Sequence, residues 1–313
     1  MKIILGTMTF GDQVEQADAE TLLQAFTGSG HEELDTAHTY CDGRTEEMLG
    51  RMLPAQKRAG LYLASKVNPW HEGGLQPSSV RKQMSESLQR LGSDSVDLLY
   101  LHSPDLETPV EQTLETCFEL YEQGCFRHFG LSNYASWQVA EVVELCRKNG
   151  WMVPEVYQGM YNALTRDVER ELFPCLRNYD IRFYAYNPLA GGLLTGKHLS
   201  MEDIPVNGRF KVERGYLDRY WKKEYFDVLQ ELREACSRAG LKPVEVAMSW
   251  LTHHSLMDSG HGDGIILGAS SLDHLQQNLA ACAQAAPLDE SILEILDRGW
   301  EIIKPDCFRY FRP

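Results

Sequence analysis

The sequence lacks any long hydrophobic run. Its first apolar stretch, Ile3 to Leu5, is broken by Gly6, and no window approaches the roughly 18 consecutive apolar residues of a membrane-spanning helix. The N-terminus also lacks the pattern of a secretory signal peptide. We therefore expect a cytoplasmic protein that has no membrane partner.

Cysteines in paired or CxxC spacing are missing as well. The eight cysteines are scattered along the 313 residues, several of them in helix-like segments, which is typical of reduced thiols in a cytosol. The histidines show no established metal-ligand spacing either, including the group around His253, His254 and His261. The sequence thus predicts neither a disulfide framework nor a metal site.

Positive charge is scarce. Thirty Lys and Arg residues stand against 45 Asp and Glu, which gives a net charge of −15 and a pI near 5.1. Such a charge balance opposes binding to nucleic-acid phosphates or to an anionic membrane surface. We expect no nucleic-acid partner, and an anionic ligand would have to be held by a local cluster of basic residues.

What the sequence does contain is a regular alternation of β-rich and helical segments. The β-rich runs are residues 3–6, 32–35, 61–67, 95–102, 126–132, 155–158, 181–186 and 264–268. Helical spacing is found at residues 18–26, 45–53, 80–91, 110–122, 137–148, 168–177, 244–253, 273–282 and 291–303. Near-continuous apolar runs such as Val96 to Leu101 are typical of parallel strands buried on both faces. Eight such units favour an α/β fold, a closed (β/α)8 (TIM) barrel with C-terminal helices, over an open doubly wound sheet.

One connection in this pattern is exceptionally long. It runs from Pro188 to about Trp221, after the seventh strand, and loops of this length often act as lids. It combines several glycines with basic residues, as expected of a clamp for an anion. Gly191 to Lys197 also has the spacing of a phosphate-binding loop, but His198 replaces the Ser or Thr that binds magnesium, which argues against a nucleotide hydrolase. No linker divides the chain, so residues 1–313 are predicted to form one barrel domain.

Polar residues end most of the predicted strands. In a (β/α)8 barrel, chemistry gathers at the carboxyl ends of the strands. The residues at these ends are Asp35, Lys66, His102, Ser132 with Asn133, Gln158 and Tyr186. Because six different strands supply them, a shared site explains them better than six independent strand caps.

Four residues of this region could hold and protonate a carbonyl group. A free tyrosine has a pKa of about 10, so Tyr40 can act as a general acid near neutral pH only if a cation stabilises its phenolate. Lys66 offers that cation, and Asp35 would keep the lysine charged in a partly dry pocket. His102 would orient the carbonyl oxygen through a hydrogen bond. We therefore predict Tyr40 as the general acid, Lys66 and Asp35 as its tuning pair and His102 as the residue that orients the substrate.

The same residues, in this order and separation, resemble those of the aldo-keto reductases over essentially the whole chain. The resemblance is carried by Leu34-Asp35-Thr36-Ala37 with Tyr40, Ser65-Lys66, Leu101-His102, Gly130-Leu131-Ser132-Asn133, Gln158 and Ala185-Tyr186. Further motifs resemble the aflatoxin-aldehyde and succinic-semialdehyde reductase branch of the family. These are Trp70, Gly191 to Lys197, Gly268 to Leu272 and Tyr310 to Arg312.

The resemblance implies hydride transfer from a nicotinamide nucleotide, because the four residues contain no electron source. It places Ser132, Asn133 and Gln158 on the carboxamide and Tyr186 against the ring. It implies further coenzyme contacts, under a loop that covers the cofactor, from Asn187, Pro188, Leu189, Gly191, Lys197, Arg209, Ser270, Gln277 and Asn278. Many relatives carry a basic residue beside the equivalent of Ser270 for the 2′-phosphate of NADPH, and this sequence does not. The branch still favours NADPH, while the residues alone are also compatible with NADH.

The substrate is predicted to be a small aldehyde. The residues expected to contact it are Met8, Trp70, Tyr216, Arg219, Tyr310 and Arg312. An arginine fork recognises a carboxylate bidentately, so we expect aldehydes that carry an acid group, or dicarbonyls, to be reduced to alcohols. The alternative is a nucleotide-binding regulatory subunit on the same barrel with little turnover, since a fold alone does not fix function. The complete set of four residues favours the enzyme; the oligomeric state, a homodimer included, stays open.

Overall fold

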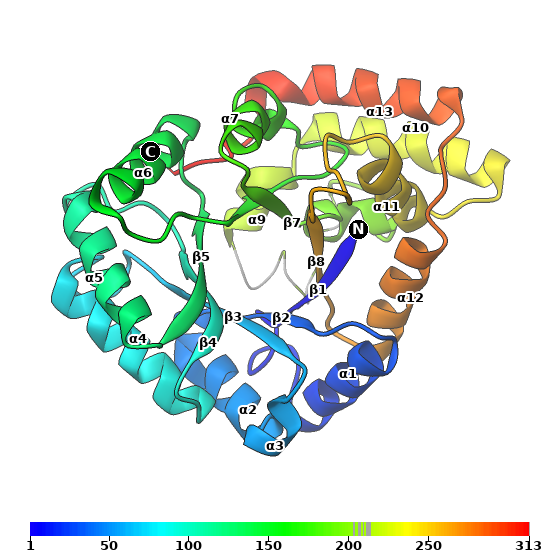
Figure 1. The fold of residues 1–313 in the computed structure, drawn as a ribbon. Helices are drawn as coiled ribbons and strands as arrows, with labels where there is room; N and C mark the ends of the chain where they lie inside the picture. The colour runs from blue at the N-terminus through cyan, green and yellow to red at the C-terminus, as the bar shows by residue number, and fades with distance from the viewer. Residues whose placement is uncertain (203, 206–207, 209, 211–213, 313) are drawn as a thin grey trace.

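The computed structural model describes residues 1–202, 204–205, 208, 210 and 214–312, with only the backbone for Ala55, Gln56 and Arg214. Its centre is a closed parallel barrel in which each strand pairs with the next and β8 pairs with β1 (Figure 1). The strands are β1 Lys2–Gly6, β2 Glu33–Asp35, β3 Tyr62–Val67, β4 Val96–Leu101, β5 Phe126–Ser132, β6 Val156–Met160, β7 Arg182–Tyr186 and β8 Gly264–Gly268. The predicted (β/α)8 barrel is confirmed.

Helices surround the barrel on its outer face (Figure 1). They are α1 Gln16–Gly28, α2 Arg44–Met52, α3 Ala55–Arg58, α4 Pro77–Leu91, α5 Val110–Glu122, α6 Ser136–Asn149, α7 Leu172–Asn178, α9 Arg214–Tyr220, α10 Lys223–Ala239, α11 Pro243–His253, α12 Leu272–Ala283 and α13 Glu290–Ile303. Short 3-10 turns lie at η1 Tyr40–Gly43, η2 Asp167–Glu169, η3 Ala190–Thr195 and η4 Lys304–Asp306. In the part of the chain that the structure describes, no helix is both long and apolar enough to cross a membrane.

Two buried clusters hold the barrel together. The larger one fills the layer between the strands and the helices. The smaller one fills the barrel interior and consists of Ile4, Ala64, Leu98, Tyr100, Val156, Tyr184 and Ile266. Since side chains of a strand alternate between its two faces, the residue two positions beyond an interior residue also points inward. Lys66 follows Ala64 in this way, and Gln158 follows Val156, so strand geometry alone places both at the carboxyl rim of the interior.

The helix boundaries follow local sequence signals. α4 begins with Pro77 in its first turn, where the missing backbone N–H costs no hydrogen bond. It ends at Leu91 and is capped by Gly92, whose φ of 59° is left-handed and therefore favours glycine. At the far end of the chain, α13 packs along α10, two helices that run side by side in Figure 1. This packing carries the C-terminal residues back toward the barrel.

The connection between β7 and β8 runs from Asn187 to Asp263 and contains η3, α9, α10 and α11. It is thus partly helical, whereas the sequence pattern indicates a long loop up to Trp221. Its first segment packs inward, because Leu193 and Leu194 are fully buried. Arg209, a predicted coenzyme contact, lies outside the described residues.

Candidate active site

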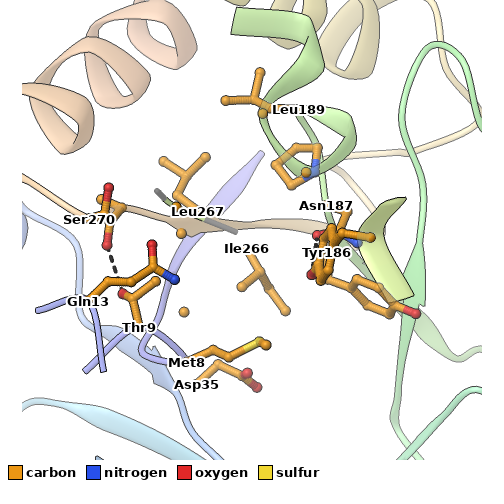
Figure 2. A pocket seen from close by; sticks show the side chains of 18 of the residues that line it. Met8, Thr9, Gln13, Asp35, Tyr186, Asn187, Leu189, Ile266, Leu267 and Ser270 are labelled. Atoms are coloured by element: carbon orange, nitrogen blue, oxygen red, sulfur yellow. Dashed lines mark hydrogen bonds between the residues drawn. The ribbon is translucent and has the colours of Figure 1, made fainter. Parts of the chain in front are cut away.

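A cavity of about 1290 Å³ opens at the carboxyl ends of the strands. It runs from Asp35, Tyr40 and His102 at one end to Ser270 and Asn278 at the other. Figure 2 shows Asp35 beside Met8 at the bottom of this space, with Ser270 and Tyr186 on opposite sides. Sites for drug-sized ligands usually measure about 300–1,000 Å³, so this cavity can hold a dinucleotide together with a small substrate.

Lys66 and Asp35 form a buried ion pair beside the cavity. The Lys66 side chain is fully buried, and its Nζ lies 2.6 Å from Asp35 Oδ1. It also donates to the carbonyl oxygen of Thr36 at 2.6 Å. Burial lowers the pKa of Lys66, and the charge of Asp35 opposes this effect. Because Asp35 is also buried, each charge depends on the other for its stabilisation.

Tyr40 lies on the loop directly after this pair. The backbone N–H of His38 donates to the Lys66 carbonyl at 3.1 Å, which ties the loop to β3. Next, Cys41 and Asp42 have φ values of 50° and 54°, a left-handed turn that leads the chain into α2. Lys66 Nζ comes within 3.4 Å of the Tyr40 hydroxyl oxygen. The tyrosine hydroxyl therefore has a buried cation as its neighbour.

His102 follows β4 and faces the same cavity. Its ring centroid lies 5.9 Å from that of Tyr40, and the two rings are nearly perpendicular. The Trp70 ring also packs against His102, with ring centroids 5.1 Å apart. Burial, followed by the charges of Lys66 and Arg312, holds the pKa of His102 well below its ordinary value of 6.5. His102 is therefore neutral at physiological pH, with one ring N–H to donate.

Of the residues predicted to surround the nicotinamide, Ser132, Asn133 and Tyr186 form one hydrogen-bonded group. Asn133 Nδ2 donates to Ser132 Oγ at 3.0 Å and to the His102 carbonyl at 2.8 Å. The Tyr186 hydroxyl donates to Asn133 Oδ1 at 2.8 Å. Gln158 Nε2 donates to Asp35 Oδ2 at 2.8 Å. Gln158 thus belongs to the Asp35–Lys66 group.

After β7, the backbone that lines the cavity adopts a series of left-handed conformations. Asn187 has φ 55°, Ala190 has φ 49° and Gly191 has φ 69°. A side chain at position 191 would meet a ring carbon of Tyr216 at 2.7 Å, so this position also needs glycine for space. Successive backbone N–H groups in such turns can form concave anion-binding sites. Pro188 and Leu189 line the cavity in the same stretch.

At the far end of the cavity, Lys197 meets the start of α12. Its Nζ contacts His274 Nε2, while His274 Nδ1 lies 3.2 Å from Ser270 Oγ. Gln277 and Asn278 follow on the same helix and line the cavity. Because Lys197 is basic and Ser270 carries a hydroxyl, this end combines a cation with a hydrogen-bonding group.

Most residues predicted to contact the substrate line the cavity. Met8, Trp70, Tyr216, Arg219 and Arg312 all line it. The Arg312 guanidinium lies 4.5 Å from the Trp70 ring centroid, and that of Arg219 lies 5.4 Å from the Tyr216 ring centroid. Among the described lining residues, the carboxylates are those of Asp12 and Asp35. The two arginines therefore make this side of the cavity basic.

Tyr310 differs from its prediction as a substrate contact. It does not belong to the described residues that line the cavity. Its hydroxyl donates to Glu171 at 2.7 Å and accepts a hydrogen bond from the Ser136 N–H at 3.0 Å. The side chain is 3% exposed, so Tyr310 anchors the C-terminal tail against α6 and the segment before α7. The backbone N–H of Arg312 then donates to the Asn133 carbonyl, which holds the tail at the cavity mouth.

Sequence reasoning missed several lining residues on the loop after β1. Thr9 and Gln13 lie near Ser270 in Figure 2, and Thr9 Oγ1 donates to the Ala269 carbonyl at 2.8 Å. The rule that sites lie at the carboxyl ends of strands points to this loop, but no charge or motif distinguishes these residues. Thr39, before η1, and Phe210, in the connection after β7, also line the cavity and were not predicted.

The closed parallel barrel carries a cluster of ionisable side chains at its carboxyl rim, where barrel enzymes have their active sites. The sequence model of the Aldo/keto reductase family matches residues 2–301. The chain belongs to the aldo/keto reductases and is an oxidoreductase. This confirms the family resemblance read from the motifs.

Its relatives include reductases named for aldehydes. Aflatoxin B1 aldehyde reductase member 2 of Mus musculus is 45% identical, over 99% of this chain and 87% of the relative. Aflatoxin B1 aldehyde reductase member 4 of Homo sapiens is 44% identical, over 98% of this chain and 96% of the relative. Aldo-keto reductase family 7 member A3 of Homo sapiens is 43% identical, over 99% and 96%. These similarities support aldehyde reduction with a nicotinamide dinucleotide.

Proposed function

We propose that this protein reduces small aldehydes to alcohols with NADPH, and that Tyr40 is the general acid. The observation that carries the proposal is the approach of Lys66 Nζ to the Tyr40 hydroxyl at 3.4 Å, at the bottom of a cavity large enough for coenzyme and substrate. The names of the relatives point to the same reaction class.

Lys66 and Asp35 determine how easily Tyr40 gives up its proton. As the aldehyde oxygen gains negative charge, Tyr40 donates its hydroxyl proton and becomes a phenolate. A lysine ammonium close to the hydroxyl stabilises that phenolate. Asp35 holds the ammonium in place through a 2.6 Å contact and balances its charge in the buried site. Both charges are fixed before the reaction, so little reorganisation is needed when the proton moves.

His102 orients the substrate in this proposal. A neutral imidazole donates one hydrogen bond, and a donor aimed at the carbonyl oxygen stabilises the charge that develops on it. A protonated His102 would add a second cation next to Lys66. The low pKa of His102, caused by burial and by the charge of Lys66, avoids that arrangement.

The described residues fit a nicotinamide dinucleotide. When bound, this coenzyme supplies the hydride that the amino-acid side chains lack. Ser132, Asn133 and Gln158 offer donors and acceptors for a carboxamide, and Tyr186 offers an aromatic face in the same wall. The turns from Asn187 to Gly191, in which Asn187, Ala190 and Gly191 are left-handed, would hold phosphate groups through the N–H groups of Leu189 and Gly191. Gln277 and Asn278 would hold the adenosine half.

Preference for NADPH over NADH is inferred from the cluster of Lys197, Ser270 and His274. A 2′-phosphate carries about two negative charges and needs a cation and hydrogen-bond donors. Lys197 can supply the cation that the sequence lacks beside Ser270, because the fold brings it to the start of α12. The sequence separation of 77 residues hides this contact from motif analysis.

The substrate class follows from Arg219 and Arg312. Two guanidinium groups at the cavity mouth, with Asp35 engaged by Lys66, leave positive charge that can bind a carboxylate. Burial lowers the pKa of Arg312, and the charge of Arg219 adds to this effect, as expected of two cations sharing one region. We therefore infer a preference for aldehydes that carry a carboxylate, such as succinic semialdehyde.

The proposal is tested by following NADPH absorbance with succinic semialdehyde and with 4-nitrobenzaldehyde. Replacing Tyr40 by Phe should lower kcat by about 10²- to 10⁴-fold, the usual contribution of a general acid. NADPH binding, measured by quenching of tryptophan fluorescence, should remain within about twofold, since the ring is kept. Tight NADPH binding by the wild type without turnover of any aldehyde would instead indicate a nucleotide-binding regulatory subunit.

A further inference from the structure

A group of metal-ligating side chains lies next to the active site but takes no part in the proposed reaction. His38 is buried in the loop between β2 and η1, His71 lies in the turn after β3 and Glu86 projects from α4. His38 Nε2 is 2.7 Å from Glu86 Oε2, and the rings of His38 and His71 are 5.3 Å apart. One ligand atom from each residue lies within 4.8 Å of the other two.

We propose that His38, His71 and Glu86 bind a divalent transition-metal ion of the zinc type. Two imidazoles and one carboxylate form a donor set that suits Zn²⁺. Within the described residues, this is the one place where three potential His, Cys, Asp or Glu ligands meet at such distances. The sequence gives no sign of it, because the ligands are separated by 33 and 15 residues and come from three different elements.

Both imidazoles are prepared to act as ligands. Burial lowers the pKa of His38, although the hydrogen bond to Glu86 opposes this effect, so the ring is neutral near pH 7. His71 Nδ1 lies 3.1 Å from the Glu72 carbonyl, which leaves Nε2 with its lone pair for a cation. Metal-bound histidines usually donate their second ring N–H to such an oxygen.

Binding requires a change of tautomer and one short movement. The neutral His38 ring, whose Nε2–H now bonds Glu86, would carry its single proton on Nδ1 instead, so that the Nε2 lone pair can bind the metal with no net loss of a proton from the ring. Ligand atoms at 2.0–2.1 Å from a tetrahedral zinc lie about 3.4 Å apart, so His71 has to approach by roughly an ångström while the 2.7 Å contact between His38 and Glu86 widens. His71 can make this movement, since it is half-exposed and the turn continues through Gly73 and Gly74, which both have left-handed φ values.

The surrounding charges permit a cation. Arg90 Nη2 lies 3.7 Å from Glu86, but the same guanidinium also contacts Glu46 and the His38 carbonyl. Arg90 thus has two other acceptors when Glu86 turns to a metal. Lys82 on α4 adds one positive charge and Glu72 in the turn one negative charge nearby. A bound ion would tie the Tyr40 loop and the Trp70 turn to α4.

The test is a titration of the metal-free full-length protein with Co²⁺ and Zn²⁺. We expect one Co²⁺ per chain with the visible absorption of a tetrahedral nitrogen and oxygen site, displaced by Zn²⁺. The near-ultraviolet charge-transfer band of a thiolate should be absent, which distinguishes this site from the eight cysteines. Zn²⁺ should also raise the Tm in proportion to the logarithm of its free concentration.

Variants decide whether these three residues bind the ion. Glu86→Gln and His71→Gln should each weaken Zn²⁺ binding by at least about tenfold and abolish the rise in Tm. Glu155→Gln is the matched control, because His128 and Glu155 form a histidine–carboxylate pair at 2.9 Å that belongs to no such group. Circular dichroism without metal checks that each variant is folded. The proposal is overturned if wild type binds no Co²⁺ or Zn²⁺ saturably, if Glu86→Gln binds equally well, or if the spectrum is that of a thiolate site.

Discussion

Lys66 is the residue on which the site depends most. Its ammonium is fully buried and reaches Asp35, the Thr36 carbonyl and the Tyr40 hydroxyl. Removing one partner of such a pair leaves the other charge buried without compensation. In the proposed reaction, the same group therefore contributes both to the stability of the barrel rim and to the acidity of Tyr40.

Replacing Lys66 by Met should cost about 3–5 kcal/mol of unfolding free energy, the usual penalty for an orphaned buried charge. Turnover should fall by at least about 10²-fold, because Tyr40 loses the cation beside it. Urea unfolding and NADPH consumption measure the two effects. The Asp35→Asn/Lys66→Met double variant is the control: it should regain most of the stability and none of the activity. A stable single variant would contradict the role of the pair.

The pH dependence of aldehyde reduction should show an alkaline limb only. Burial lowers the pKa of Lys66, so the ammonium is lost below the ordinary value of 10.5, and phenolate stabilisation is lost with it as pH rises. On the acid side, the low pKa of His102 keeps the imidazole neutral through pH 6.5. We expect kcat/KM for 4-nitrobenzaldehyde to be flat near pH 6–7 and to fall at higher pH. A break near 6.5 would show that His102 titrates normally.

At the scale of elements, η3 is a segment in which a single added carbon atom would disturb the packing. Gly191 combines a left-handed φ of 69° with a position 2.7 Å from the Tyr216 ring for any added Cβ. Tyr216 in turn donates to Asn187 Oδ1 at 3.0 Å, which holds the start of the same segment. A side chain at position 191 would push apart two parts of the cavity wall.

The substitution Gly191→Ala should therefore weaken NADPH binding by about tenfold and cost about 1–2 kcal/mol of stability through strain. Gly192→Ala is the matched control. Its φ of 114° is also positive, but an added Cβ would meet nothing within 4 Å among the described atoms. Fluorescence titration and thermal unfolding compare the two variants. Equal effects would mean that backbone conformation, and not contact with Tyr216, limits this position.

The helices and strands themselves could largely be predicted, because the periodicity of hydrophobic residues and the continuous apolar runs indicate them. β5 and β8 have the predicted bounds, as does α5. The predicted helix at residues 168–177 is instead divided into η2 and α7, since Glu171 has φ −137° and interrupts the helical backbone. The short α3 was missed because four residues cannot show a helical period.

The site could be predicted only where sequence position implies spatial position. Strand-end residues such as Lys66 and Gln158 meet because parallel strands end on one rim. Tyr310 was predicted to line the cavity together with Arg312, but its hydroxyl is held by Glu171 and the Ser136 N–H outside the cavity lining, and no local pattern reveals such contacts between distant segments. The contact of Lys197 with His274 depends on how α12 packs against the β7 connection, and no local pattern reveals it.

For the whole molecule, closure of the barrel brings distant parts of the chain together. β1 pairs with β8 from Lys2 opposite Gly264 to Gly6 opposite Gly268, so the first loop lies beside the last strand. The C-terminal tail then crosses to β5, where Arg312 is bound to Asn133. The substrate region thus contains residues from both ends of the chain.

This arrangement makes Arg312 a test of substrate choice. Arg312→Ala should lower kcat/KM for succinic semialdehyde by about 10- to 100-fold, the loss of a charged hydrogen bond of about 1.5–3 kcal/mol. Turnover of 4-nitrobenzaldehyde, which has no carboxylate, should change little. Arg309→Ala is the control, because Arg309 lies outside the described cavity lining. If both aldehydes are unaffected in Arg312→Ala, the carboxylate clamp is wrong.

The hydrogen bond from Gln158 to Asp35 links ligand binding at Gln158 to the protonation of Lys66. Asp35 accepts from Gln158 through one oxygen and from Lys66 through the other. A ligand that draws the Gln158 amide away strengthens the hold of Asp35 on Lys66, and so changes the affinity of the lysine for its proton. By thermodynamic reciprocity, the protonation state of Lys66 changes the affinity for that ligand by the same factor. In the proposed reaction, one carboxylate would thereby make coenzyme capture and proton uptake parts of a single equilibrium.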